Sequence, residues 1–218
     1  MIGAQYGEQP RCPLCAGLGA EPFHQDPKRS FWRCPVCALV FVSPAQRPDM
    51  ETERARYEKH HTSADDAGYV RFLQHIAEPV VHRLPAGSEG LDYGSGPSSV
   101  LADLLTQTGR PTVAYDPLFR KDGAALERTY DFVTSCEVME HVHAPAVFLA
   151  RVANLVRPGG VFAVMTSFYE DAESFAPWWY KRDITHVCFY HEMTMQWVAR
   201  TNRWALDLPA TNVALFTL

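Results

Sequence analysis

From residue 87 onward, short continuous apolar runs alternate with segments in which apolar residues recur at spacings of three and four. The continuous runs predict buried strands in EGLDYG, PTVAYDP, DFVTS and VFAVMT. The spaced segments predict helices in SSVLADLLTQTG, PAVFLARVANLV and HEMTMQWVARTN, and WALDL with NVALFTL predicts a closing hairpin. Strands that alternate with helices are typical of α/β proteins, so we expect a mostly parallel sheet covered on both faces, with an antiparallel edge strand.

The chain before residue 87 divides into three parts. Residues 64–84 carry apolar side chains at helical spacing, which predicts an amphipathic helix. Residues 49–63 are polar and predict a connector, helical in part, that includes His60 and His61. Residues 1–48 contain seven prolines and few long apolar runs, so they cannot build much of a core. We therefore expect a small module over residues 1–48, a connector over 49–63 and a main domain over 64–218.

The composition is that of a soluble globular protein. Of the 218 residues, 47% are hydrophobic and 21% are charged, and no stretch approaches the roughly 20 apolar residues that span a bilayer. The first residues, MIGAQYGEQPR, lack a basic region followed by an apolar one, so we expect no secretion signal, no membrane association and a cytoplasmic location. The net charge of −5 argues against a broad electrostatic grip on nucleic acid and favours small or neutral substrates.

Four of the six cysteines form two CPxC pairs. Cys12 and Cys15 are separated from Cys34 and Cys37 by 18 residues, a spacing typical of four-thiolate zinc sites. Bound zinc would replace the missing core of a small ribbon, and four cysteines leave no open position for catalysis. Ala16 and Ala38 follow the pairs where glycine is common, and redox-active or unpaired thiols are the alternative. We interpret the lone Cys136 and Cys188 as buried apolar residues.

A glycine turn joins the first predicted strand of the main domain to a helix. It reads Asp92-Tyr93-Gly94-Ser95-Gly96, and glycines at such a turn let the backbone approach a ligand closely. About 20 residues later, Asp116 follows the second strand, where a carboxylate can accept hydrogen bonds from a ribose diol. The pattern therefore indicates a nucleoside-containing ligand.

This arrangement of an acid followed by GxG resembles motif I of the class I S-adenosylmethionine-dependent methyltransferases. The likeness continues through YDFVTSCEVMEHVHAP, LVRPGGVFAVMT and DITHVCFYHEMTMQWVARTNRW, over roughly residues 64–218. It implies a Rossmann-like sheet, with cofactor-binding roles for Asp92, Tyr93, Gly94, Ser95, Gly96, Asp116 and Glu137. Only 14 residues separate Asp116 from Asp131, so the family's third strand must be short or irregular here, and we assign no adenine-binding residue.

The hexapeptide CEVMEH, residues 136–141, concentrates ionisable groups after the DFVTS strand. If the chain turns helical after Ser135, then Glu137, Glu140 and His141 share one face. In one interpretation the acids cap the first helical turn and His141 is a packed histidine. In the other, these side chains bind a divalent cation such as Mg²⁺, Mn²⁺ or Fe²⁺.

The ExxEH arrangement resembles that of small-RNA 3′-end 2′-O-methyltransferases and of ubiquinone-pathway O-methyltransferases of the type 11/23 families. The resemblance implies that a later histidine completes the cation site, and His186 in DITHV is the matching residue. A cation would lower the pKa of the acceptor hydroxyl. Without one, His141 or His186 would act as general base, with Glu137 also in the catalytic cluster.

Residues 175–182, FAPWWYKR, combine aromatic and basic side chains just before His186. They predict either a packed lid or a surface that stacks a planar acceptor or an unpaired base, with Lys181 and Arg182 meeting an anionic group. We interpret His143 and His191 as surface or capping residues.

These features together predict an S-adenosylmethionine-dependent methyltransferase with a structural zinc ribbon, acting on oxygen of a small molecule. One alternative is an RNA methyltransferase that holds its substrate with the ribbon. The negative net charge and the modest ribbon, with five basic and three acidic side chains, argue against this alternative. The other is a non-catalytic adaptor that binds a partner protein through the ribbon, against which stand the intact glycine turn and Asp116. The sequence indicates neither the acceptor nor the oligomeric state.

Overall fold

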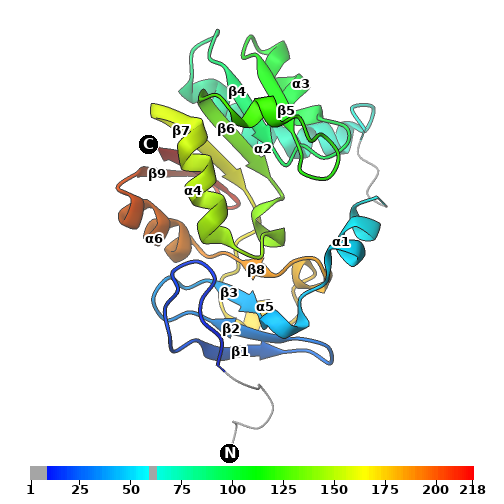
Figure 1. Cartoon of the computed structure of the whole chain (residues 1–218), viewed down its shortest axis with the longest axis vertical. Coiled ribbons are helices and arrows are strands. Elements are labelled where there is room, and N and C mark those ends of the chain that lie inside the picture. The colour runs from blue at the N-terminus through cyan, green and yellow to red at the C-terminus, as the bar shows by residue number, and fades with distance from the viewer. Residues whose placement is uncertain (1–8, 59–62) are drawn as a thin grey trace, which may run out of the picture.

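The computed structural model describes residues 9–58 and 63–218, arranged around two β-sheets (Figure 1). A six-stranded sheet has the order β5-β4-β6-β7-β10-β9, and a four-stranded sheet has the order β1-β2-β3-β8. Residues 59–62 of the expected connector, with His60 and His61, lie outside the described residues, as do residues 1–8. In Figure 1 the larger sheet lies above and the smaller sheet lies below.

The larger sheet confirms the expected α/β class. The four strands β5, β4, β6 and β7 are parallel, and the C-terminal hairpin adds β10 antiparallel to β7 and β9 antiparallel to β10. The strands span β4 (Gly90–Tyr93), β5 (Thr112–Tyr115), β6 (Tyr130–Cys136), β7 (Val156–Met165), β9 (Ala205–Ala210) and β10 (Val213–Thr217).

Helices cover both faces of this sheet. The helices α2 (Ala67–Arg83) and α3 (Val100–Gln107) pack on one face, and α4 (Pro145–Leu155) and α6 (Glu192–Asn202) pack on the other. The period of two along β6 sends Phe132 into the core beneath α2 and α3, and sends Val133 into the core beneath α4. Each helix predicted from apolar spacing is present.

The segment between β5 and β6 corrects the expectation of a short or irregular third strand. Over residues 117–129 the described chain forms no strand, only the 3₁₀ helix η2 (Gly123–Leu126). The Asp122 side chain accepts a hydrogen bond from the N–H of Ala124, and the hydroxyl of Tyr130 donates to the carbonyl of Ala125 at 2.8 Å. The connection therefore adds no strand beside β5, which is the edge of the sheet.

The smaller sheet combines residues from both ends of the chain. The strands β1 (Glu21–Gln25), β2 (Ser30–Arg33) and β3 (Val40–Val42) form an antiparallel meander. The fourth strand, β8 (Cys188–Phe189), pairs antiparallel with β3, so that Phe41 faces Cys188. The side chains of β3 are buried, since β3 lies between β2 and a strand from the rest of the protein.

The helix α1 (Met50–Tyr57) lies in the region expected to be a connector. The Asp49 side chain caps it by accepting from the N–H of Thr52 at 2.9 Å. None of its residues is buried, and two side-chain contacts hold it in place: a hydrogen bond between Glu53 and His143 at 2.7 Å, and an ion pair between Arg56 and Asp183 at 2.8 Å. Short elements complete the described fold: η1 (Pro44–Gln46), η3 (Met139–His141), α5 (Ala172–Phe175) and η4 (Tyr180–Arg182).

Within residues 9–58 and 63–218, no helix has both the length and the apolar character that crossing a bilayer requires.

Candidate functional site

A cavity of about 910 Å³ opens at the carboxyl ends of β4, β5 and β6. Open α/β sheets bind ligands at this edge, because the strand ends leave a crevice between neighbouring loops. The glycine turn enters from β4, Asp116 from β5 and the segment 136–142 from β6. The predicted site residues that line the cavity are Tyr93, Gly94, Ser95, Gly96, Asp116, Glu137, Glu140, His141 and His186.

The glycine turn adopts backbone angles that favour glycine. Gly94 has φ +85° and Gly96 has φ +64°, both in the left-handed region. A Cβ atom on Gly94 would lie 2.4 Å from a methyl carbon of Val138, whereas one on Gly96 would meet no atom of residues 9–58 and 63–218 within 4 Å. Gly94 is therefore required for packing inside the protein, and Gly96 borders open space.

Asp116 closes the turn from the neighbouring strand. Its Oδ2 accepts from the N–H of Gly96 at 3.0 Å, and its Oδ1 accepts from the N–H groups of Leu118 and Phe119 at 2.8 and 3.0 Å. The carboxylate lines the cavity and is nearly buried. Each carboxylate oxygen has two acceptor positions, so the Oδ2 atom can still accept a hydrogen bond from a ligand.

Asp92 lies behind the turn and does not line the cavity. Its Oδ1 accepts from the hydroxyl of Thr134 at 2.8 Å, and its side chain is almost completely buried. Burial raises the pKa of Asp92 to about 7, although the Thr134 bond opposes the shift and nearby Asp116 adds to it. This residue supports the turn from within the protein.

The chain after β6 does not form the α-helix that would place Glu137, Glu140 and His141 on one face. Glu137 has φ +52°, and its N–H donates to the carbonyl of Met165 at 2.8 Å. The 3₁₀ helix η3 follows only at residues 139–141. The left-handed turn separates Glu137 from the other two side chains, and it directs Glu140 and His141 toward His186.

Glu140, His141 and His186 form one cluster, with candidate ligand atoms within 4.8 Å of one another. The Nε2 atom of His141 lies 3.8 Å from Oε1 of Glu140, and the two imidazole rings are 4.6 Å apart. Glu140 is fully buried, with Oε2 accepting from the hydroxyl of Thr166 at 2.8 Å. Glu137 is not part of this cluster.

Two buried atoms of the cluster have no hydrogen-bond partner within the part of the chain that the structure describes. They are Oε1 of Glu140 and Nδ1 of His186. Unpaired buried polar atoms are costly and are common at binding sites that are completed by a ligand. One carboxylate oxygen and two imidazole nitrogens form a donor set that suits a borderline divalent cation.

The protonation states of the cluster follow from its surroundings. The Nδ1 atom of His141 lies 3.1 Å from the carbonyl of Thr185, which only accepts, so Nδ1 carries the hydrogen and Nε2 is the basic nitrogen. Burial lowers the pKa of His186 to about 4, so this ring is neutral at pH 7. Burial, with the nearby Glu140 carboxylate, raises the pKa of Glu137 to about 9, so Glu137 is protonated at that pH.

Two aromatic rings approach the histidines of the cluster; Tyr57 was not identified from the sequence, whereas Tyr180 belongs to the aromatic segment 175–182 singled out there. Tyr57 of α1 places its ring 5.1 Å from that of His141, and Tyr180 places its ring 4.2 Å from that of His186. The polar segment DMETERARY has no apolar face that would predict its position over the cavity. His143, expected at the surface or in a cap, pairs with Glu53 of this helix, and His191 caps α6 as expected, with Nδ1 accepting from the N–H of Met193.

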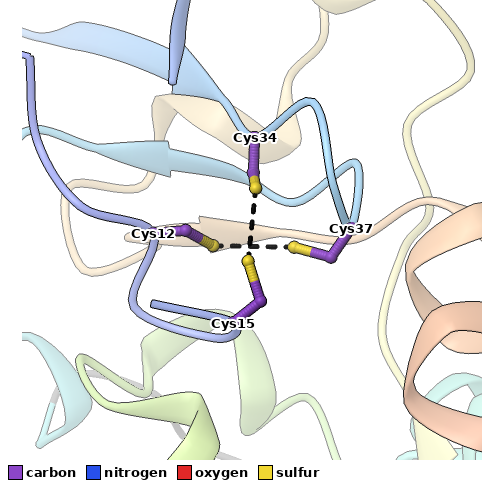
Figure 2. Close-up of side chains that lie close together, drawn as sticks. All are labelled: Cys12, Cys15, Cys34 and Cys37. Atoms are coloured by element: carbon purple, nitrogen blue, oxygen red, sulfur yellow. Dashed lines mark hydrogen bonds between the residues drawn. The ribbon is translucent and has the colours of Figure 1, made fainter. Parts of the chain in front are cut away.

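The four cysteines of the CPxC pairs converge on one point (Figure 2). The Sγ atoms of Cys12 and Cys37 are 3.5 Å apart, and those of Cys15 and Cys34 are 3.4 Å apart. Four thiolates around one zinc ion, each at about 2.3 Å, would be separated by roughly 3.8 Å, so these two pairs need only move slightly apart to reach a tetrahedral site. All four cysteines are free thiols, and the cluster fits zinc.

The two CPxC turns, which span residues 12–16 and 34–38 and are called knuckles below, share the same backbone conformation and hydrogen bond. Ala16 and Ala38 have φ +57° and +58°, the left-handed conformation that glycine adopts more readily. In each knuckle the alanine N–H donates to the carbonyl of the first cysteine, Cys12 or Cys34, at 2.9 and 3.0 Å. The hydrogen bond from Cys37 lowers the pKa of Cys12 to about 5, and the same bond raises the pKa of Cys37, so one thiolate is favoured within the pair and binding of zinc would displace the remaining protons.

Comparison with known proteins gives consistent results. A family model described as "Methyltransferase domain" matches residues 68–206. Ubiquinone biosynthesis O-methyltransferases from Proteus mirabilis and Burkholderia multivorans are 35% and 41% identical over 78 residues, which cover 36% and 35% of this chain and 32% and 33% of those proteins. The match thus spans about a third of the length of these curated relatives.

Two solved structures from Burkholderia thailandensis share the fold. The 1,6-didemethyltoxoflavin-N1-methyltransferase, with bound 1,6-didemethyltoxoflavin and S-adenosylhomocysteine, superposes with a TM-score of 0.54 and 15% identity, covering 91% of this chain and 97% of that chain. An O-methyltransferase family protein superposes with a TM-score of 0.51 and 18% identity, and the alignment covers 75% of this chain and 61% of that chain.

Proposed function

The chain belongs to the methyltransferase-domain family whose model covers residues 68–206, and on that premise we propose that it transfers a methyl group from S-adenosylmethionine to an oxygen atom of a small molecule. The observation that carries this proposal is that one cavity joins the glycine turn and Asp116 to the Glu140–His141–His186 cluster. Its volume of about 910 Å³ is at the upper end of ordinary ligand sites, which supports binding of cofactor and acceptor together.

S-adenosylmethionine, when bound, supplies an electrophilic methyl carbon on a positively charged sulfur. We assign the turn from Tyr93 to Gly96 to its methionine part, because Gly96 leaves open space on the cavity side. Asp116 is assigned to the ribose hydroxyls. Glu137 is assigned to the part of the cavity that would hold the cofactor, because its buried Oε1 atom has no hydrogen-bond partner among the described residues. Asp92 acts indirectly by supporting the turn.

The acceptor must lose a proton as its oxygen attacks the methyl carbon. His141 is suited to take this proton, because the bond from Nδ1 to the Thr185 carbonyl leaves Nε2 as the basic nitrogen. His186 is neutral and adds a second imidazole to the same part of the cavity. A divalent cation held by Glu140, His141 and His186 would lower the pKa of the acceptor hydroxyl, and this donor set of one oxygen and two nitrogens fits Mn²⁺ or Fe²⁺ better than Mg²⁺.

The N-terminal module is assigned a structural zinc ion at Cys12, Cys15, Cys34 and Cys37. Two of its five basic side chains are engaged with protein: Arg29 is buried against backbone carbonyls, and Arg47 donates to the carbonyls of Val42 and His143. Arginines held in this way cannot neutralise phosphates. This favours a small-molecule acceptor over RNA.

Calorimetry with S-adenosylhomocysteine tests the proposal. We expect Asp116→Ala to weaken binding by about 100-fold or more, because charge-assisted hydrogen bonds to the ribose are lost. Asp122→Ala is the matched control, since Asp122 also accepts from a nearby backbone N–H but lies outside the cavity lining. Equal affinities of the wild type and the Asp116 variant would overturn the assignment of the cavity.

A further inference from the structure

The cysteine-ribbon module consists of the four cysteines Cys12, Cys15, Cys34 and Cys37 with strands β1 to β3. We propose that this module is a brace of the active site, meaning that it restrains the backbone of the catalytic cluster, and that Arg29 is a positioning residue for His186. The module would hold the backbone of residues 181–189 through Arg29 and strand β3, and so fix the second histidine of the catalytic cluster. The importance of His186 rests on the proposed function, whereas the mechanical connection does not.

Arg29 is the first part of the brace. It lies between β1 and β2, and only 6% of its surface is exposed. Its Nη1 donates to the carbonyls of Asp183 and His186 at 3.1 and 3.3 Å, and its Nη2 donates to the carbonyl of Lys181. The planar guanidinium has five donors in a fixed geometry, so a single side chain can hold three carbonyls on both sides of a turn.

Arg29 is itself held in place. Asp26 accepts from the backbone N–H of Arg29 at 2.8 Å and lies 3.6 Å from its Nε atom. The guanidinium also sits 5.1 Å from the centre of the Phe31 ring. The side chain is therefore oriented by its own hairpin before it meets the backbone of residues 181–186.

Strand β3 is the second part of the brace. The N–H of Val42 donates to the carbonyl of Val187 at 2.9 Å, and β8 continues this pairing with Phe41 opposite Cys188. On the other side, the N–H of Val187 donates to the carbonyl of Glu140 at 2.8 Å. The residue next to His186 thus links the smaller sheet to the backbone of Glu140.

The cysteine knuckle lies at the start of the same strand. The N–H of Cys34 donates to the carbonyl of Leu39, and the hydroxyl of Tyr169 donates to the carbonyl of Ala38. Because bound zinc would join this knuckle to that of Cys12 and Cys15, it would restrain β3 and everything paired with it. Loss of zinc should therefore loosen the His186 segment, although the cysteines lie outside the cavity lining.

The first experiment compares Arg29→Gln with Arg110→Gln. Arg110 is a matched control, since it is 8% exposed and donates to the carbonyls of Val81, Leu84 and Thr108, away from the cavity. Both variants should lose thermal stability. Only Arg29→Gln should lower kcat, by about 10- to 100-fold through misplacement of His186, with affinity for S-adenosylhomocysteine within about twofold of wild type. Arg29→Lys should recover only part of the rate, because an ammonium lacks the fixed fork.

The second experiment does not depend on activity. Hydrogen exchange is followed by mass spectrometry in the full chain with one equivalent of zinc, after zinc removal, and in Arg29→Gln. Peptides that contain Val187 should exchange about tenfold faster or more in the last two samples, while peptides over residues 91–98 should be unchanged.

Unchanged exchange at Val187 in both samples would overturn the proposal, as would a kcat of Arg29→Gln equal to that of Arg110→Gln. If no methyl transfer to any acceptor is found, the exchange experiment still decides whether the brace exists. Failure of the proposed function is thus distinguishable from failure of this inference.

Discussion

The Nδ1 atom of His141 lies 3.1 Å from the carbonyl oxygen of Thr185, the residue immediately before His186. This contact connects the segment after β6 to the segment that carries the second histidine. It also fixes the His141 tautomer, because a carbonyl oxygen only accepts hydrogen bonds. The Nε2 atom is consequently available either as a general base or as a metal ligand.

Replacement of His141 should therefore remove most of the activity. We expect His141→Ala to lower kcat by about 10²- to 10⁴-fold, the usual contribution of a positioned acid–base group. Affinity for S-adenosylhomocysteine should change little, because the glycine turn and Asp116 lie on other strands. His75→Ala is a control on the exposed side of α2, and it should match the wild type in steady-state kinetics. Equal rates for the two variants would exclude His141 from the reaction.

A metal-assisted reaction predicts sensitivity to chelators. Activity should be lost in EDTA and restored by Mn²⁺ or Fe²⁺ more fully than by Mg²⁺, and Glu140→Ala should be inactive with or without added metal. The control is Glu78→Ala, an exposed acid of α2 that should respond as the wild type does. Zinc content must be measured after chelation, since the cysteine site is proposed to bind a different ion. Full activity in EDTA would leave the histidine base as the only mechanism.

The sequence was sufficient to predict most of the fold. Apolar spacing identified α2, α3, α4 and α6, because each helix buries one face against the sheet. The CPxC spacing likewise identified four cysteines that the structure brings together, with both following alanines in the strained conformation that glycine would relieve. Each of these features depends on residues that are close together in the chain, so the sequence pattern alone is enough to predict it.

The parts that sequence could not predict depend on contacts between distant segments. Arg29 holds carbonyls more than 150 positions away, and no periodic pattern marks such a contact. The left-handed turn at Glu137 breaks the expected helix, since its N–H is used by Met165 on the neighbouring strand. Tyr57 reaches His141 from a helix without an apolar face, so its role followed only from tertiary structure.

The buried carboxyl of Asp92 predicts an unusual pH dependence of stability. Burial raises its pKa from 3.8 to about 7, so the folded protein binds this proton more tightly than the unfolded chain. The resulting stabilisation is complete below pH 4 and is lost as pH rises to about 7. Relative to Asp92→Asn, which can still accept from Thr134, the wild type should lose roughly 1.4 kcal/mol of unfolding free energy per pH unit across this range.

Urea unfolding of both proteins at pH 5, 6, 7 and 8 measures this difference. Above pH 7 the difference should stop changing, because both states are then ionised. A constant difference from pH 5 to pH 8 would mean that Asp92 ionises normally in the folded protein.

The two glycines of the turn allow a paired test of where the ligand lies. Gly94→Ala should destabilise the protein by about 3 kcal/mol or more, because its new methyl group would overlap Val138 as well as strain the backbone. Gly96→Ala should cost only about 1–2 kcal/mol, the price of the left-handed conformation alone, since its methyl group meets no atom of the described residues within 4 Å.

The same methyl group on residue 96 would nevertheless occupy the space assigned to the methionine part of the cofactor. We therefore expect Gly96→Ala to fold, by thermal unfolding and circular dichroism, yet to bind S-adenosylhomocysteine at least about tenfold more weakly, a loss of about 1.4 kcal/mol in calorimetry. Wild-type affinity in a folded Gly96→Ala variant would show that the nucleoside binds elsewhere, because close approach to this turn leaves no room for a side chain.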